Sequence, residues 1–85
     1  MKNAVIIGAG QTGRGFIAPI LQDDEYTITF IDKDEELIKS LNQKKEYSIR
    51  YFGNTAPTRK IDAFKAFAST SGEAVEAIRN ADVIC

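Results

Sequence analysis

Apolar and polar positions near the start of the chain predict a strand, a glycine-rich turn and a helix. Residues 3–7 are almost wholly apolar and rich in branched side chains, which is typical of a strand covered on both faces. Glycines follow at positions 8, 10, 13 and 15. The next apolar residues recur at helical spacing: Phe16, Ile17, Ile20 and Leu21. Pro19 predicts a local kink rather than the end of this helix, because the carbonyl that it crowds belongs to Gly15, where the backbone adjusts easily.

A second strand and a second helix follow. Residues 26–31 are dense in β-branched and aromatic side chains, which favours a strand that ends at Asp32. The helix after it is indicated by an apolar face: Leu37, Ile38 and Leu41. Its first turn carries acidic side chains that the helix dipole stabilises: Asp34, Glu35 and Glu36.

The next stretch predicts a β-hairpin between about residues 47 and 63. Residues 47–52 alternate, with Tyr47, Ile49 and Tyr51 on one side, and residues 53–57 are a cluster of turn formers. Residues 58–68 return as one or two strands. We therefore expect the hairpin to be inserted before the third parallel strand.

A third helix and a fourth strand are predicted last. Residues 70–73 (Thr-Ser-Gly-Glu) match the capping-box pattern and introduce a helix whose inward side chains are Ala74, Val75 and Ile78. Residues 82–85 then begin a strand that has the composition of a buried one. Natural domains seldom stop inside such a strand, because its edge and side chains would be left uncovered. We therefore expect the chain to be an excerpt of a longer protein.

Composition narrows the class of protein. The 85 residues fit one small domain, and 44% hydrophobic with 27% charged residues is ordinary for a soluble globular domain. A net charge of −1 gives no electrostatic case for nucleic acid or membrane as a partner. The longest apolar run, residues 4–7, is too short to span a bilayer. Cys85 is the single cysteine and cannot form an internal disulfide, which indicates a reducing, cytoplasmic compartment.

Residues 8–13 carry the motif with the clearest chemistry. Gly8-Ala9-Gly10-Gln11-Thr12-Gly13 fits G-x-G-x-x-G between a buried strand and a helix. Gly8 permits the tight turn, Gly10 lets a pyrophosphate approach the backbone, and Gly13 lets the helix pack close to the sheet. Gln11 and Thr12 are expected to lie over the cofactor and to offer backbone N–H groups. The alternative is a glycine turn that only packs a helix on a strand.

Asp32 ends the second strand and follows Gly13 at close to the spacing of about 20 residues expected for a ribose-binding carboxylate. A negative charge there would repel a 2′-phosphate, so the cofactor NAD is favoured over NADP, although the neighbouring Lys33 softens that preference. The alternative role for Asp32 is the N-cap of the following helix. The two roles are compatible.

Arg14 follows the motif directly and is a further candidate. Its guanidinium has the geometry to bind the pyrophosphate or a substrate phosphate, and a solvated charge on the first helical turn is an equal alternative. The chain has no histidine, and no residue is assigned as catalytic or as a metal ligand. Cys85 is interpreted as a small apolar filler of a buried strand. Acidic residues are interleaved among the basic residues of 44–62, which favours a solvated surface over a nucleic-acid site.

Together the elements predict an α/β fold: a three-layer, Rossmann-type, doubly wound and mainly parallel sheet. The expected strand order is 3-2-1-4, with the hairpin outside it and the glycine turn at the carboxyl edge of the strands. Residues 1–85 then form the N-terminal part of an NAD-binding domain whose remainder is absent.

The residues Gly-Ala-Gly-Gln-Thr-Gly-Arg-Gly-Phe-Ile at 8–17 resemble the N-terminal signature of the mannitol-1-phosphate 5-dehydrogenase group, within the long-chain polyol dehydrogenase family. The resemblance continues at residues 30–32, at Leu41-Asn42 followed by Tyr47, and around Gly53, and it loosens after about residue 55. It implies that Gly8, Gly10, Gly13 and Asp32 bind NAD, with Arg14 as a further candidate. Pro19 departs from the pattern and affects only the helix shape.

The resemblance implies reversible hydride transfer between D-mannitol 1-phosphate with NAD and D-fructose 6-phosphate with NADH. It also implies that the catalytic base and most substrate contacts lie in a helical C-terminal domain beyond these residues. Two alternatives stay open: a dehydrogenase of an unphosphorylated polyol or sugar acid, and a non-enzymatic NAD(H)-sensing regulatory domain. The partners expected are NAD(H) and a small sugar or polyol phosphate, and the oligomeric state is not indicated.

Overall fold

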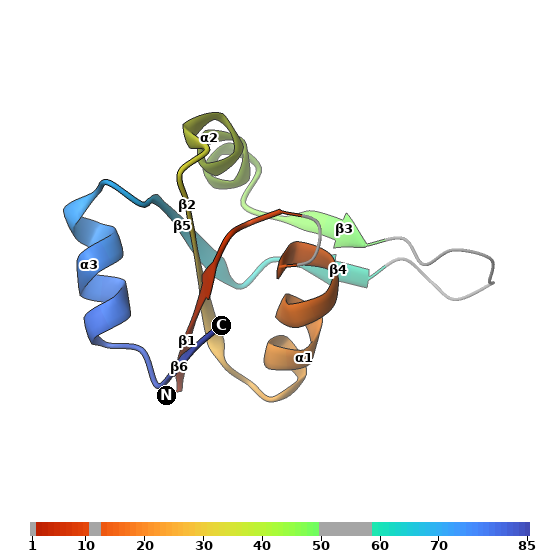
Figure 1. The fold of residues 1–85 in the computed structure, drawn as a ribbon. Helices are drawn as coiled ribbons and strands as arrows, with labels where there is room; N and C mark the ends of the chain where they lie inside the picture. The colour runs from red at the N-terminus through yellow and green to blue at the C-terminus, as the bar shows by residue number, and fades with distance from the viewer. Residues whose placement is uncertain (1, 11–12, 50–58) are drawn as a thin grey trace.

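The computed structural model describes residues 2–10, 13–49 and 59–85 as strands and helices around one main sheet (Figure 1). Its strands are β1 (Asn3–Ile7), β2 (Thr27–Asp32), β3 (Tyr47–Ile49), β4 (Arg59–Ile61), β5 (Phe64–Ala68) and β6 (Val83–Ile84). Its helices are a π-helical turn η1 (Gly13–Ile17), α1 (Ala18–Asp23), α2 (Glu35–Lys44) and α3 (Gly72–Arg79). Gln11, Thr12 and the turn of the predicted hairpin lie outside the described residues.

The main sheet has the predicted parallel topology. Its order is β5-β2-β1-β6, which is 3-2-1-4 when only the parallel strands are counted. β1 pairs with β2 over its whole length, from Asn3 opposite Thr27 to Ile7 opposite Ile31. β3 and β4 form a separate antiparallel pair, with Tyr47 opposite Ile61. The predicted hairpin, inserted before the third parallel strand, is therefore confirmed for its described strands.

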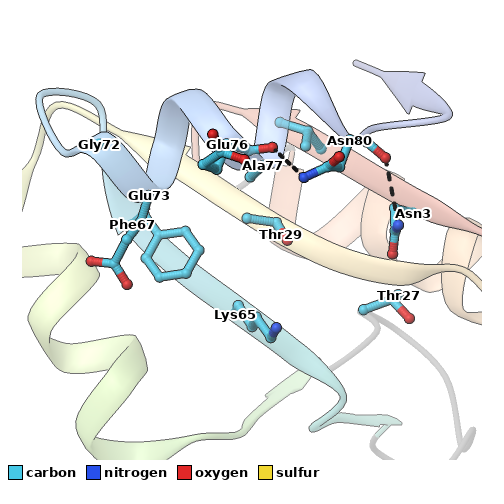
Figure 2. Close-up of a pocket in the computed structure, with 11 residues that line it drawn as sticks. Asn3, Thr27, Thr29, Lys65, Phe67, Gly72, Glu73, Glu76, Ala77 and Asn80 are labelled. Carbon is cyan, nitrogen blue, oxygen red and sulfur yellow. Dashed lines mark hydrogen bonds between the residues drawn. The ribbon is translucent and has the colours of Figure 1, made fainter.

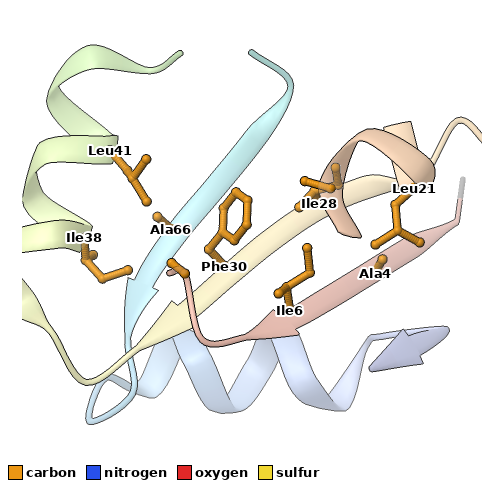
Figure 3. Close-up of a cluster of buried hydrophobic side chains, with 10 residues drawn as sticks. Ala4, Ile6, Leu21, Ile28, Phe30, Ile38, Leu41 and Ala66 are labelled. Carbon is orange, nitrogen blue, oxygen red and sulfur yellow. The ribbon is translucent and has the colours of Figure 1, made fainter. Parts of the chain in front are cut away.

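Helices cover both faces of the sheet, so the fold has three layers (Figure 1). On one face α1, α2 and the hairpin surround the larger core, in which Phe30 and Ile28 are fully buried (Figure 3). On the other face α3 packs over a smaller cluster that contains Val5 and Ile31. The strands read as continuous apolar runs because each face has a covering layer. β6, near the end of the chain, lies parallel to β1 near its start (Figure 1).

The first helix passes through Pro19 without ending. A π-helical turn over Gly13–Ile17 comes first, and the α-helix begins at Ala18, so Pro19 occupies its first turn. A proline fits there because the first amides of a helix need no partner within it. The local irregularity expected at Pro19 therefore takes the form of a π-turn on its N-terminal side.

The acidic first turn and the apolar face of α2 lie where the sequence predicts them. The Asp34 carboxylate accepts a hydrogen bond from the Leu37 amide at 3.1 Å and caps the N-terminus. Ile38 and Leu41 are buried on the face that contacts the sheet. Asn42, on the same helix, donates its amide to the Ala66 carbonyl of β5 at 3.0 Å, which satisfies a backbone group of an edge strand.

Two predictions for α3 are wrong. Val75 and Ile78 are 54% and 41% exposed, and only Ala74 is fully buried. The helix contacts the sheet through small side chains, Ala74, Ala77 and Ala81, whose spacing puts them on one face and allows a close approach. The N-cap is Ser71, whose hydroxyl accepts the Ala74 amide at 3.1 Å, so the pattern that begins at Thr70 is not the cap.

The interpretation of Cys85 as a buried filler is also wrong. Cys85 is exposed, and its neighbour Ile84 is 54% exposed. The physical reason is position: among the described residues, the two-residue strand β6 is the last strand of the sheet and pairs with β1 alone. An edge strand lacks the second neighbour that would cover it.

Candidate functional site

The glycine turn leaves the carboxyl end of β1 beside the carboxyl end of β2. The Gly8 amide donates to the Ile31 carbonyl at 2.7 Å, which continues the β1–β2 pairing by one residue. Gly8 then turns the chain with φ of 97°, a conformation in which a side chain is strained. The turn is therefore held at the edge of the sheet where open α/β folds bind their ligands.

Gly10 and Gly13 differ in what surrounds them. A Cβ atom built on Gly13 would lie 2.5 Å from the Gly8 carbonyl oxygen and 3.1 Å from the Ile6 Cγ2 atom. No side chain fits there, so the first helical turn packs directly on the strand, as the motif predicts. A Cβ on Gly10 would meet nothing within 4 Å. Gly10 therefore faces open space, as a close approach by a ligand requires.

Asp32 turns its carboxylate toward the glycine turn. Oδ2 accepts the Ala9 amide at 2.7 Å, and Oδ1 accepts the Asp34 amide at 2.8 Å. These bonds, first that from Asp34 and then that from Ala9, lower the pKa of Asp32 below the ordinary value of 3.8, against a smaller opposing effect of burial. Asp32 is thus a carboxylate at neutral pH. It does not cap α2, a role taken by Asp34.

Arg14 joins the glycine turn to the hairpin through its backbone. Its amide donates to the Gly10 carbonyl at 3.0 Å, and its carbonyl accepts the Tyr47 hydroxyl at 2.8 Å. Its side chain is half-buried, and the buried Nε has no hydrogen-bond partner among the described residues. The alternative of a fully solvated charge is therefore not what the structure shows. Tyr47 was not predicted as a site residue, and its alternation within residues 47–52 signalled only a strand.

An open pocket of about 440 Å³ lies beside the turn. Its walls come from β1, the glycine turn, η1 and the end of β6: Ile6, Ile7, Gly8, Gly10, Gly13, Ile17 and Cys85. The pocket lies between β1 and β6, where the sheet order reverses. Sequence reasoning missed Cys85 as a wall of this pocket, because it is the pairing of β6 with β1 that brings Cys85 beside Ile7.

A larger pocket, of about 610 Å³, lies between the sheet and α3 (Figure 2). Thr29, Lys65 and Phe67 point into it from the strands, and Glu73 and Glu76 lie along the helix (Figure 2). None of the predicted site residues that the structure describes lines it. The larger cavity therefore belongs to a different face of the sheet from the glycine turn.

Two further observations concern the described part of the chain. Within residues 2–10, 13–49 and 59–85, no group of three or more His, Cys, Asp or Glu side chains is arranged to hold a metal ion. Among the same residues, no helix has both the length and the apolar character needed to cross a bilayer.

A parallel sheet with a glycine turn at its order reversal, and a carboxylate from the next strand on that turn, defines a Rossmann-type nucleotide-binding domain. The chain belongs to the mannitol dehydrogenase family: the family model described as the mannitol dehydrogenase Rossmann domain matches residues 2–85.

Two similar proteins are mannitol-1-phosphate 5-dehydrogenases by name, which is consistent with this family. The chain is 37% identical over 83 residues to a mannitol-1-phosphate 5-dehydrogenase of Shouchella clausii (strain KSM-K16). It is 34% identical over 83 residues to a mannitol-1-phosphate 5-dehydrogenase of Anoxybacillus flavithermus (strain DSM 21510 / WK1). Each match covers 95% of this chain and 22% of the relative. The chain therefore spans about a fifth of the length of these relatives.

Proposed function

We propose that this chain is the NAD-binding part of an oxidoreductase that interconverts D-mannitol 1-phosphate and D-fructose 6-phosphate. The observation that carries the proposal is the Asp32 carboxylate, which lies against the glycine turn through the Ala9 amide at 2.7 Å. The reaction is suggested by the two relatives, which are named mannitol-1-phosphate 5-dehydrogenases.

The turn fits the diphosphate of a dinucleotide. Among the described residues, the amides of Gly10 and Gly13 donate no hydrogen bond to another group, so both are free to face an anion. The helical stretch that begins at Gly13 adds the positive end of its dipole. Open space at Gly10 leaves room for the phosphates. Gln11 and Thr12, between these two glycines, remain proposed contacts of the same kind.

Asp32 fits the adenosine ribose. Each carboxylate oxygen accepts one backbone amide, and a carboxylate has about four lone-pair sites, so it retains the capacity to accept ribose hydroxyl groups. Its lowered pKa keeps it charged at neutral pH. A fixed negative charge at this place disfavours a 2′-phosphate, which supports NAD rather than NADP as the cofactor.

The division of labour follows from these contacts. When bound, the nicotinamide supplies the hydride chemistry, and the residues of this chain hold and orient the dinucleotide. We assign no catalytic base within these residues. The base and the sugar-phosphate contacts are proposed to lie in sequence corresponding to the rest of the relatives' length.

A steady-state assay of the full-length protein tests the proposal. The pair fructose 6-phosphate and NADH is compared with the pair fructose and NADH and with the pair fructose 6-phosphate and NADPH. In each pair one reactant is varied while the other is saturating. We expect turnover with fructose 6-phosphate and NADH, with kcat/KM at least tenfold higher than for either substitution. Turnover with unphosphorylated fructose alone would remove the substrate assignment. A strict NADPH requirement would remove the role given to Asp32, and NADH binding without any turnover would favour a sensing domain.

A further inference from the structure

Tyr47 connects the hairpin to the first helical turn after the glycine motif. It is the first residue of β3, and its hydroxyl donates to the Arg14 carbonyl at 2.8 Å. Its ring packs against Phe30 and Phe64, with centroid distances of 6.2 and 5.5 Å. Because the ring is held from two sides, the hydroxyl is aimed at one acceptor. Tyr47, which lies outside the parallel sheet, therefore contacts the helical turn that follows the glycine motif.

The Arg14 carbonyl needs such a donor because of Pro19. In a π-helical turn a carbonyl bonds the amide five residues later, which for Arg14 is position 19. Proline has no backbone N–H, so Pro19 cannot donate a hydrogen bond to the Arg14 carbonyl. A partly buried carbonyl without a donor is costly, and the Tyr47 hydroxyl supplies one. The proline, the π-turn and the tyrosine thus form one local arrangement.

Hydrogen bonds fix the backbone of Arg14 on both sides of its Cα atom. The amide of Arg14 is bonded to the Gly10 carbonyl and its carbonyl to Tyr47. The side chain leaves the same peptide, and its buried Nε has no partner among the described residues. A covered guanidinium nitrogen that makes no hydrogen bond within this part of the chain is an unsatisfied donor. A change of the side-chain conformation toward an anion would give it a charge-assisted partner.

The hydroxyl remains a donor throughout the physiological range. Burial raises the pKa of Tyr47 to about 12, and the nearby Arg14 charge opposes that rise only in part. The phenol is therefore protonated at neutral pH, and the bond to Arg14 does not depend on pH there.

We propose that Tyr47 is a positioning residue for the cofactor site, which through the Arg14 peptide directs the Arg14 guanidinium toward the cofactor's diphosphate. The proposal rests on the proposed function and adds the hairpin to the NAD site. The hairpin strand β3 then contributes to cofactor affinity although it lies outside the parallel sheet.

Tyr47→Phe in the full-length protein tests this, because it keeps the ring and removes only the hydroxyl. We expect the Kd for NADH, measured by fluorescence titration, to rise about 3- to 10-fold, the range for losing one hydrogen bond. The kcat at saturating NADH should stay within about twofold of the wild type, since the cofactor still supplies the chemistry. The matched control is Tyr26→Phe, a hydroxyl removed at the amino end of β2, away from the glycine turn, which should leave the Kd unchanged.

A double-variant cycle separates positioning from a purely structural role. If Tyr47 acts through Arg14, Tyr47→Phe should change the Kd for NADH by less than about twofold in an Arg14→Ala background. An undiminished effect in that background overturns the proposal, as does an unchanged Kd in the single variant. If the wild type itself does not bind NADH, the cofactor assignment has failed, and this proposal fails with it.

Hydrogen exchange gives a second measurement should Tyr47→Phe fold poorly. In the wild-type protein, NADH should slow amide exchange both in residues 13–18 and in β3 (Tyr47–Ile49). Protection confined to the glycine turn and its helix would overturn the role of the hairpin.

Discussion

Gly13 controls how closely the first helix approaches the sheet. A Cβ atom there would lie 2.5 Å from the Gly8 carbonyl oxygen, so the backbone itself would have to shift to admit a side chain. Gly15, two residues later, has nothing within 4 Å of a built Cβ atom. The two glycines therefore differ sharply in their tolerance of alanine, although they are close neighbours in the sequence.

We predict that Gly13→Ala destabilises the protein by about 1 to 3 kcal/mol, the usual cost of overpacking. Gly15→Ala is the control, and it should change the free energy of unfolding by less than about 1 kcal/mol. Urea unfolding followed by circular dichroism measures both. Equal stability of the two variants would show that the helix does not pack on the strand at Gly13 as described.

Asp32 makes the free energy of unfolding depend on pH. Its pKa is lowered in the folded state, so its contribution to stability is fully present above the ordinary value of 3.8 and is lost as the pH falls through the lower folded-state value. Asp32→Asn removes this titration. We expect wild-type stability to fall more steeply than that of Asp32→Asn once the pH drops below about 3.8, as read from urea midpoints. Parallel profiles would contradict the two amide bonds to this carboxylate.

At the scale of elements, α3 begins where a hydroxyl satisfies its first amides. Ser71 accepts the Ala74 amide and also donates to the Ala68 carbonyl at 2.8 Å, so it connects the helix to the end of β5. Thr70, one position earlier in the chain, also carries a hydroxyl but is exposed. Local sequence offers both residues as caps, and the path of the chain out of β5 selects Ser71.

Ser71→Ala should therefore cost about 1 kcal/mol of stability, the typical loss of an N-cap. Thr70→Ala is the matched control, with an expected change below about 0.5 kcal/mol. The measurement is the denaturation midpoint of each variant at constant m-value. A larger loss at Thr70 than at Ser71 would move the start of α3 by one residue.

At the scale of the whole molecule, Phe30 joins the parallel sheet to the hairpin. It is fully buried in β2 and contacts the rings of Tyr47 and Phe64 (Figure 3 shows its place in the core). α1 and α2 pack on the same face. This one side chain therefore packs against both the hairpin and the neighbouring strand β5.

Phe30→Ala should cost about 3 to 5 kcal/mol, as expected when a buried aromatic side chain is removed. That is a large part of the total stability of a typical domain. Ile20→Ala, at a side chain that is 55% exposed, is the control and should cost under about 1 kcal/mol. Thermal unfolding of the full-length protein compares them, and similar melting temperatures would contradict the central place of Phe30.

Local pattern was enough for the sheet order, the hairpin, the glycine turn and the apolar face of α2. Each depends on neighbours in the chain: branched residues in a run, glycines before a helix, apolar residues three or four apart. Strands that alternate with helices leave few topologies, because crossovers are short and right-handed. The expected order 3-2-1-4 followed from that restriction.

The errors arose where distant segments determine exposure. The helical spacing of Val75 and Ile78 does not reveal that α3 meets the sheet through alanines. The apolar character of residues 82–85 does not reveal that β6 lies at an edge. In both cases burial is set by which surface comes to lie opposite, and that surface comes from another part of the chain.

The sequence by itself determined that a strand, a glycine turn and a helix would follow one another, with Asp32 at the end of the next strand. Those features need only local backbone geometry and residue type. Only the tertiary structure decided that the Asp32 carboxylate meets the Ala9 amide and that Tyr47 meets the Arg14 carbonyl. Hydrogen bonds between residues 23 or 33 positions apart exist only once the sheet and the hairpin have brought their partners together.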